Sequence, residues 1–385
     1  MALIPSQPSR LGQVNLANDV DALFLKVFSG EIITTFEKNN VMMPLHRVRT
    51  IQSGKSAQFP VTGVAAAGYH TPGESILSQG TTGTTGYGNT TSASNTAGNM
   101  TVAFEGNAGI SSKYLSKFKH NEKVIFIDDV LLSSAFVADI DEMKNHYDVR
   151  SIYSTEIGRA LAYAADKNLI RTVIGGARNL QPRFSSSAYA NEAAKVTAKD
   201  PYAGERIRVG SAADTTTGTL IDAFFAAATK MDEKNVPNDG RYAVLPPAEY
   251  YKLVNGDSDA INRDYNDPNG SVASGMVMSV AGIQIKKSNH LPTADESGGS
   301  DDALHGAAGI KNDIFGANTG YSGANFTSTR GIIFHGEGVG TVKLMDLSLE
   351  TDYITERLGT LLLAKYAMGH GVLRDECCFE LYATA

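Results

Sequence analysis

The chain has 385 residues, a formal net charge of −7, 42% hydrophobic and 19% charged residues, and two cysteines. This length allows two or three domain-sized units, and the acidic balance argues against a protein that grips nucleic acid through a clustered basic face. The adjacent cysteines, Cys377 and Cys378, exclude a disulfide framework, and neither a signal peptide nor a membrane-spanning run of about 18 apolar residues is expected.

The beginning of the chain predicts an arm followed by a helix. Residues 1–20 are polar, contain Pro5 and Pro8, and predict an extended arm. In residues 21–38 the apolar side chains recur at helical spacing, although Gly30 interrupts the pattern. The apolar residues of this stripe are Phe24, Leu25, Phe28, Ile32 and Phe36. Residues 47–61 then alternate loosely between apolar and polar, which predicts strands.

A long uncharged tract follows. Residues 75–104 contain no charged side chain, and 19 of the 24 residues from 78 to 101 are Gly, Ser, Thr or Asn. Such a tract cannot bury enough apolar area to fold alone. Two interpretations stay open, a disordered loop and a Thr-rich β-excursion that contact with a neighbouring chain orders. A basic stretch at 111–120 comes next and contains Lys113, Lys117 and Lys119.

The most regular pattern lies in residues 138–177, which contain no proline. We expect one continuous helix of roughly 55 Å, capped by Asp139 or Asp141 and stopped by Gly175 and Gly176. Two shorter helices meeting at Gly158 are the alternative. Charged residues such as Asp166 and Arg171 fill the other positions. The residues expected on the apolar face are Ile140, Met143, Tyr147, Tyr153, Ile157, Leu161, Ala164, Leu169 and Val173.

The rest of the chain predicts a mixture of strands and helices. Residues 219–230 predict an amphipathic helix, and a second helix should start at Pro246 and Pro247. Residues 181–213 and 292–324 predict loops. Strands are expected at 123–132 (ending in a turn), 242–245, 277–286, 331–334, 341–349, 357–366 and 378–382.

No catalytic motif is complete. Gly54-Lys55-Ser56 resembles the end of a phosphate-binding loop, but Arg49 stands where that loop needs glycine. Gly336, Gly338 and Gly340 follow a strand, yet no helix opens after them. The eight histidines include no pair four residues apart and no cluster with ligand spacing. We therefore predict no catalytic residue, metal or cofactor, which favours a structural protein over an enzyme.

Five stretches, in this order, resemble the major capsid proteins of short-tailed, double-stranded-DNA phages of the T-odd type. They are LFLKVF at residues 23–28, SGKSAQFPV at 53–61, NHYDVRS at 145–151, VGTVKL at 339–344 and AKYAMGHG at 364–371. Each stretch is weak alone, but together they are specific, and the resemblance spans residues 21–375. One departure stands out, because the loop between Gly73 and Glu122 is longer here than in that family and carries the uncharged tract.

The resemblance implies an α+β, HK97-like capsid fold. The implied parts are an N-terminal arm at 1–59, an extended loop (E-loop) at 60–125, a peripheral domain (P-domain) at 126–180 and 341–372, and an axial domain (A-domain) at 181–340 and 373–385. The long helix would be the spine of the P-domain. Contacts between subunits are expected from the arm and the extended loop, at Phe24, Phe28, Thr82, Thr85, Tyr87, Thr90, Lys113 and Lys117.

The function implied by the resemblance is that of an icosahedral shell. Copies of the chain would form hexamers and pentamers in the host bacterial cytoplasm, with a scaffolding protein, a portal at one vertex and double-stranded DNA inside, bound without sequence specificity and without a membrane. Two alternatives remain open, an encapsulin-like compartment of the same fold and a soluble α+β enzyme of the cytoplasm. Megadalton particles in size-exclusion chromatography would favour a shell, whereas a monomer or dimer would favour the enzyme.

Overall fold

The computed structural model describes residues 35–36, 39–62, 72, 120–144, 149–178, 203–211, 217–255, 270–271, 276–297, 311–315 and 320–384. The chain divides into two compact units. The first unit consists of Met1–Gln58 and Val124–Ala385, and the second of Phe59–Lys123.

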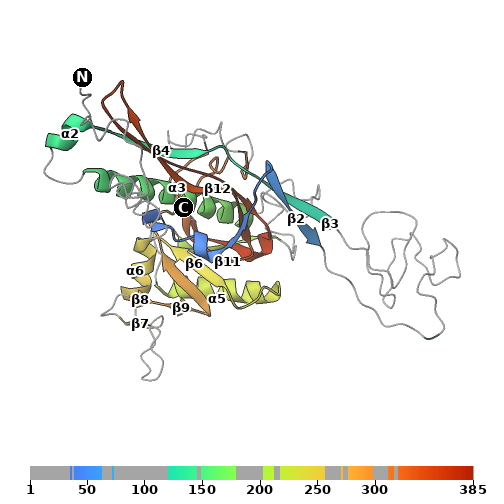
Figure 1. Cartoon of the computed structure of the whole chain (residues 1–385). Helices are drawn as coiled ribbons and strands as arrows, with labels where there is room; N and C mark the ends of the chain where they lie inside the picture. Colours follow the sequence, from blue (N-terminus) through green and yellow to red (C-terminus); the bar gives the residue numbers. More distant parts are fainter. Residues whose placement is uncertain are drawn as a thin grey trace, which may run out of the picture. The chain divides into compact units, whose positions relative to one another are not determined.

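A four-stranded sheet in the first unit has the order β1-β12-β13-β4. The strands are β1 (Arg47–Thr50), β12 (Val339–Ile354), β13 (Gly359–Val372) and β4 (Leu131–Ala138). Strand β1 runs parallel to β12, and the other neighbours are antiparallel. The long helix α3 (Val149–Ala177) runs alongside these strands (Figure 1). The strands predicted at 341–349 and 357–366 are confirmed, and both are longer than expected.

Only one face of this sheet is packed against α3. Successive side chains of a strand point to opposite faces, and every second residue of β13 from Leu362 to Met368 is buried. The other face leaves Leu132 57% exposed and Phe136 37% exposed. The buried cluster between sheet and helix consists of Phe36, Val137, Ile157, Leu161, Ala162, Ala165, Leu362, Ala364, Tyr366 and Met368.

Helix α3 is continuous through Gly158, so the prediction of continuity is confirmed and a helix break at that glycine is excluded. The predicted beginning is wrong, because Ala138 ends β4 and a separate short helix, α2 (Asp139–Lys144), follows it. Of the predicted apolar face, the part from Ile157 to Val173 is buried. Ile140, Met143 and Tyr153 are instead 60%, 85% and 40% exposed, because no described element covers this end of the stripe. Tyr147 lies outside the described residues.

The predicted stop at Gly175 and Gly176 is also wrong, since α3 includes both residues and ends at Ala177. Close packing explains the two glycines. A Cβ atom on Gly175 would overlap Ile314, and one on Gly176 would lie 3.0 Å from Cys378 Sγ and from Val372 Cγ1. A glycine lowers helix stability by about 1 kcal/mol relative to alanine. Here the missing side chains allow α3 to lie close to its neighbours.

A six-stranded mixed sheet in the first unit has the order β5-β14-β11-β6-β10-β9. Pairs β5/β14 and β6/β10 are parallel, and the other pairs are antiparallel. The strands are β5 (Glu205–Ser211), β14 (Cys378–Thr384), β11 (Thr329–His335), β6 (Arg241–Leu245), β10 (Ile283–Lys287) and β9 (Ser279–Val280). Helices α5 (Thr217–Glu233) and α6 (Pro247–Asn255) confirm the two helices predicted in this region.

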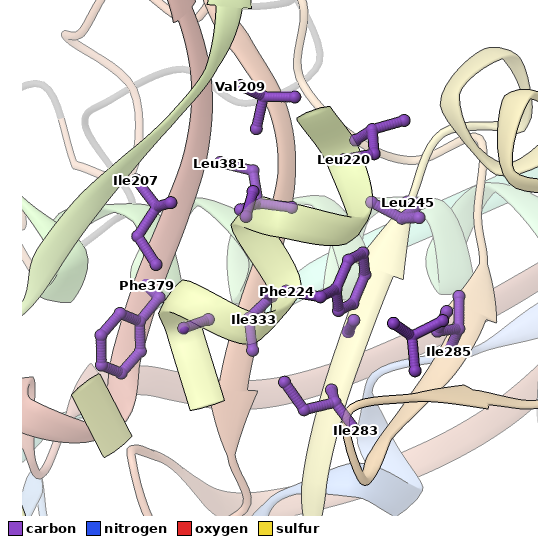
Figure 2. Packing of buried hydrophobic residues seen from close by; sticks show 14 of the residues in the cluster. Ile207, Val209, Leu220, Phe224, Leu245, Ile283, Ile285, Ile333, Phe379 and Leu381 are labelled. Carbon is purple, nitrogen blue, oxygen red and sulfur yellow. The ribbon is translucent and has the colours of Figure 1, made fainter. Parts of the chain in front are cut away.

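Both faces of the central strands are covered. Figure 2 shows Phe224 and Leu220 of α5 among Leu245, Ile333, Phe379 and Leu381 from the strands. The alternate residues Val244, Ile332, Phe334 and Cys378 belong to a second cluster, with Leu169, Ile170, Val173 and Ile174 of α3 and with Met42 and Phe326. This sheet therefore forms a core layer between α5 and the second half of α3.

Two predictions in this region need correction. The strand predicted at 277–286 is a hairpin of β9 and β10, because Ala281 and Gly282 have φ values of 51° and 76° and make the tight turn that two positive φ angles require. Strand β5 lies inside a stretch predicted to be a loop. Its partner β14 is about 170 residues further along the chain, so no local pattern reveals the pairing.

The remaining described elements are short. Strands β2 (Ser56–Thr62) and β3 (His120–Phe126), which contain the first and last residues of the second unit, pair with each other. Residues 75–104 lie outside the described part of the chain. Residues 35, 36 and 39 are helical, and the rest of the predicted helix at 21–38 is also outside the described part. The other short elements are the 3-10 helices Met43–Leu45 and Asp375–Cys377, β7 (Gly270–Ser271) and β8 (Met276–Val277).

Candidate assembly surface

Exposed apolar side chains gather at one end of the four-stranded sheet. We call Ile140, Met143, Tyr353 and Leu358 the tip patch; they come from α2 and from the hairpin that joins β12 to β13. Register pairs Gly359 with Ala138, and the Asp139 amide donates a 3.1 Å hydrogen bond to the Leu358 carbonyl oxygen. The Tyr353 hydroxyl donates a 2.8 Å hydrogen bond to Asp139 Oδ2. These contacts hold the hairpin against the start of α2.

The tip patch is unusual because of how much apolar surface it presents. Met143 is 85% exposed, Leu358 66%, Ile140 60% and Tyr353 44%. Single exposed apolar residues are ordinary on a protein surface, but four of them on two hydrogen-bonded elements indicate a contact surface. Leu358 also has a φ of 47°, a left-handed conformation that costs a leucine about 1–2 kcal/mol. The hairpin thus has an unfavourable backbone conformation at Leu358, the residue whose apolar side chain lies in solvent.

A buried carboxylate anchors the segment that precedes β1. Asp166 of α3 is fully buried, and its two oxygens accept hydrogen bonds from the amides of Val41 at 2.8 Å and Met42 at 3.0 Å. His290 Nδ1 lies 2.9 Å from Asp166 Oδ2. The helical pattern had suggested an ordinary charged position for Asp166. Instead, this residue fixes the path by which the N-terminal part of the chain enters the fold.

A chain of buried imidazoles continues from this segment into the sheet. His46 Nδ1 lies 2.8 Å from the Met42 carbonyl oxygen and must donate to it, which leaves His46 Nε2 to accept from the Thr341 hydroxyl at 2.6 Å. Thr341 Oγ1 in turn accepts from His370 Nδ1 at 2.9 Å. This assignment is that of a neutral His46 ring, and burial favours the neutral form of both imidazoles. Burial lowers the pKa of His46, and burial together with the nearby His46 and Lys343 lowers the pKa of His370 to about 3.

A second buried acid joins α3 to the six-stranded sheet. Glu380 of β14 accepts two hydrogen bonds from Arg178, at 2.9 and 2.7 Å, one from Arg206 at 2.8 Å and one from Thr329 at 2.7 Å. Burial by itself would raise the pKa of Glu380, but the two guanidinium groups and Thr329 outweigh burial and lower that pKa. This set of contacts is saturated by protein groups and therefore has a structural role.

The described residues contain no group of three or more His, Cys, Asp or Glu side chains that could hold a metal ion. In the same part of the chain, no helix has the length and apolar character that crossing a bilayer requires.

The eight side chains predicted to make contacts between subunits all lie outside the described residues, and their roles remain predictions. The tip patch was missed by the sequence reasoning. The helical pattern predicts a buried position for Ile140 and Met143. Within a few residues of sequence, an apolar side chain that a partner chain buries looks the same as one that packs within its own chain.

Comparisons with known proteins agree with the sequence resemblance. A family model described as Gp10A-like, major capsid protein, matches residues 96–382. The chain is 31% identical over 367 residues to the major capsid protein of Escherichia phage T7, covering 94% of this chain and 91% of that protein. It is 30% identical over 372 residues to the major capsid protein of Enterobacteria phage T3, covering 95% and 92%.

The solved structures give the same result. The capsid structure of Cyanophage P-SCSP1u has 36% sequence identity and a TM-score of 0.63, covering 90% of this chain and 88% of that one. The mature capsid of bacteriophage PhiM1 has a TM-score of 0.60 at 15% identity, with 90% and 87% covered, and so supports the fold alone. The predicted α+β, HK97-like fold is confirmed.

Proposed function

The chain belongs to the Gp10A-like family of major capsid proteins, and from that premise we propose that its copies assemble into hexamers and pentamers of an icosahedral shell around double-stranded DNA. The members of this family are structural capsid proteins and not enzymes, which sets aside the alternative of an α+β enzyme. The function is then repeated association, in which each copy must present surfaces that only another copy covers.

The observation that carries this proposal is the tip patch. In a single copy, Met143 and Leu358 lie mostly in solvent although both are apolar. Burying such side chains is favourable by about 1.5–3 kcal/mol each, so a neighbouring copy that covers the patch gains stability. The patch lies at the end of the sheet farthest from β1, where a neighbour can reach it without disturbing the core.

The domain assignment is part of the same proposal. The four-stranded sheet with α3 corresponds to the P-domain, the six-stranded sheet with α5 and α6 to the A-domain, and the second unit to the extended loop. The arm and the uncharged tract would supply further contacts between copies, at Phe24, Phe28, Thr82, Thr85, Tyr87, Thr90, Lys113 and Lys117. The tract carries no charge that would oppose desolvation, and its Thr residues suit a strand added to a neighbour's sheet edge.

The partners of the shell follow from its role. We expect a scaffolding protein during assembly in the host bacterial cytoplasm and a portal at one vertex. The net charge of −7 fits a shell that encloses DNA without binding its sequence.

The test is assembly of the purified chain, measured by analytical ultracentrifugation and negative-stain electron microscopy. The parent chain should form closed particles of megadalton size, and the variant Met143→Glu/Leu358→Glu should remain as small species with unchanged circular dichroism. Phe225→Glu is a matched control, because Phe225 on α5 is 56% exposed and lies outside the tip patch. A parent chain that stays a monomer under all salt and crowding conditions, and also with a scaffolding protein present, would contradict the proposal.

A further inference from the structure

The face of the four-stranded sheet opposite α3 has the composition of a contact surface. Cross-strand register places Phe136 beside Leu361 and Ser134 beside Leu363. Leu361 and Leu363 are only partly buried, and Phe136 is 37% exposed. The next strand, β12, borders these residues with Asp352 and Glu350, which pair in register with Leu361 and Leu363. An apolar strip therefore lies on this open face, with an acidic border on β12 and with Lys365 beside it on β13.

We call Glu350, Asp352 and Glu356 the acidic row. All three are exposed, and Glu350 already pairs with Lys365 at 2.6 Å. Asp352 and Glu356 have no ion-pair partner among the residues that the structure describes. Two copies that met symmetrically through this face would bring the acidic rows together, which is unfavourable. The complementary surface must therefore be basic and must come from a different part of the partner copy.

Residues 39–62 have that chemistry and include an exposed edge strand. Residues 39–62 contain Arg47, Arg49 and Lys55 and no acidic residue, although the chain as a whole is acidic. We call these three side chains the basic edge. Every residue of β1 is exposed, and β1 is an edge strand. Val48, 39% exposed, alternates with the two arginines and adds apolar surface to the cations.

The basic edge cannot reach the acidic row of its own chain. Strand β1 pairs with β12 at Gly340–Lys343, and Thr50 lies opposite Lys343. At about 3.3 Å per residue, Glu350 and Asp352 are roughly 23–30 Å further along the same strand. The two charged surfaces are thus fixed at different ends of one rigid sheet, as a head-to-tail contact between copies requires.

We propose that the basic edge of one copy docks on the acidic row and the adjoining apolar strip of a second copy, in a heterologous contact that repeats around the shell. This inference rests on the proposed function and adds the identity of the two surfaces. The basic edge combines cations with the apolar side chain of Val48, and the proposed partner surface combines carboxylates with an apolar strip. This combination is typical of a contact between proteins, whereas a phosphate backbone would be bound through charge alone.

Charge exchange tests the pairing. Arg47→Glu/Arg49→Glu should reduce the assembled fraction at least about tenfold at a fixed protein concentration and low salt, and Asp352→Arg/Glu356→Arg should do the same. Combining all four substitutions should restore at least half of the parent's assembly. Lys286→Glu, a reversal at an exposed lysine of β10, is the control and should assemble like the parent. Thermal unfolding of each unassembled variant checks that the fold is kept.

The outcomes separate this inference from the proposed function. If the parent and the control assemble but both reversed variants assemble equally well, the pairing is wrong and the shell function stands. If the combined variant fails to assemble although it is folded, the two surfaces do not meet. If the Arg47→Glu/Arg49→Glu shells form normally but retain less DNA, the basic edge faces the genome and the inference is overturned.

Discussion

The two sheets of the first unit differ in how many of their faces are covered by other elements. The six-stranded sheet is covered on both faces, so that adjacent residues of one strand, such as Ile332 and Ile333, belong to different buried clusters. The four-stranded sheet is covered on one face by α3, and its other face and its tip carry exposed apolar side chains. A sheet with an uncovered apolar face is incomplete in a single copy. This difference supports the proposal that the six-stranded sheet provides internal stability and that the open face of the four-stranded sheet takes part in association.

The largest expected difference is in the loss of unfolding free energy when a phenylalanine is replaced by alanine in each of the two sheets. Phe334→Ala removes a fully buried ring of β11 and should lower the free energy of unfolding by about 3–5 kcal/mol. Phe136→Ala, on the open face of β4, should cost about 1 kcal/mol or less in the unassembled chain. Urea unfolding of both variants measures this. Similar losses would show that the open face is part of the chain's own core.

Acid should weaken the four-stranded sheet. The pKa values of His46 and His370 lie below 6.5 in the folded chain and return to about 6.5 on unfolding. Below pH 6.5 the unfolded chain therefore binds more protons, and the free energy of unfolding falls as the pH drops towards the folded values. The slope is at most about 1.4 kcal/mol per pH unit for each ring. Unfolding midpoints between pH 7.5 and 4.5 should lose this dependence in His46→Gln/His370→Gln, whatever its absolute stability.

A smaller effect tests the close packing that joins α3 to its neighbours. Gly175→Ala should destabilise the chain by about 1–3 kcal/mol, because the added methyl group overlaps Ile314. Ile314→Ala removes the atom that would be overlapped, so the double variant should lose less than the sum of the two single losses. Simple additivity would mean that the helix shifts to accommodate the methyl group and that contact at Gly175 is not tight.

The smallest change in the unassembled chain is expected at the tip. Leu358→Gly relieves a left-handed leucine, so the free energy of unfolding should stay within about 1 kcal/mol of the parent, on the stable side. Shell assembly should nevertheless decrease, because the exposed side chain is lost. Leu358→Met, which keeps an apolar side chain, should assemble like the parent. Normal assembly of the glycine variant would remove Leu358 from the proposed contact.

Much of the fold was predictable because its signals are local. The run from Ile157 to Val173 has helical spacing and is buried in the predicted helix, and the strands around Val244 and Ile333 are short apolar runs of the kind found in buried strands. The missing catalytic and metal motifs and the five family stretches led to a capsid protein without any coordinates. These properties depend on side-chain type and spacing within a few residues, and a single chain contains that information.

Other features of the fold depend on contacts between segments that lie far apart in the chain. Gly175 and Gly176 look like a helix stop in the sequence, yet they lie within the helix because neighbouring side chains leave no room for a Cβ. Asp166 looks like a solvent-facing charge, yet it is buried because two backbone amides 125 and 124 residues away need an acceptor. Strand β5 alternates Arg206, Ile207, Arg208 and Val209 over only a few residues, and its pairing with β14, about 170 residues further along the chain, is not visible in that local pattern. The sequence by itself determined the local periodicities and the family, and the tertiary structure decided which faces are covered, because burial arises from contacts between segments that are distant in the chain.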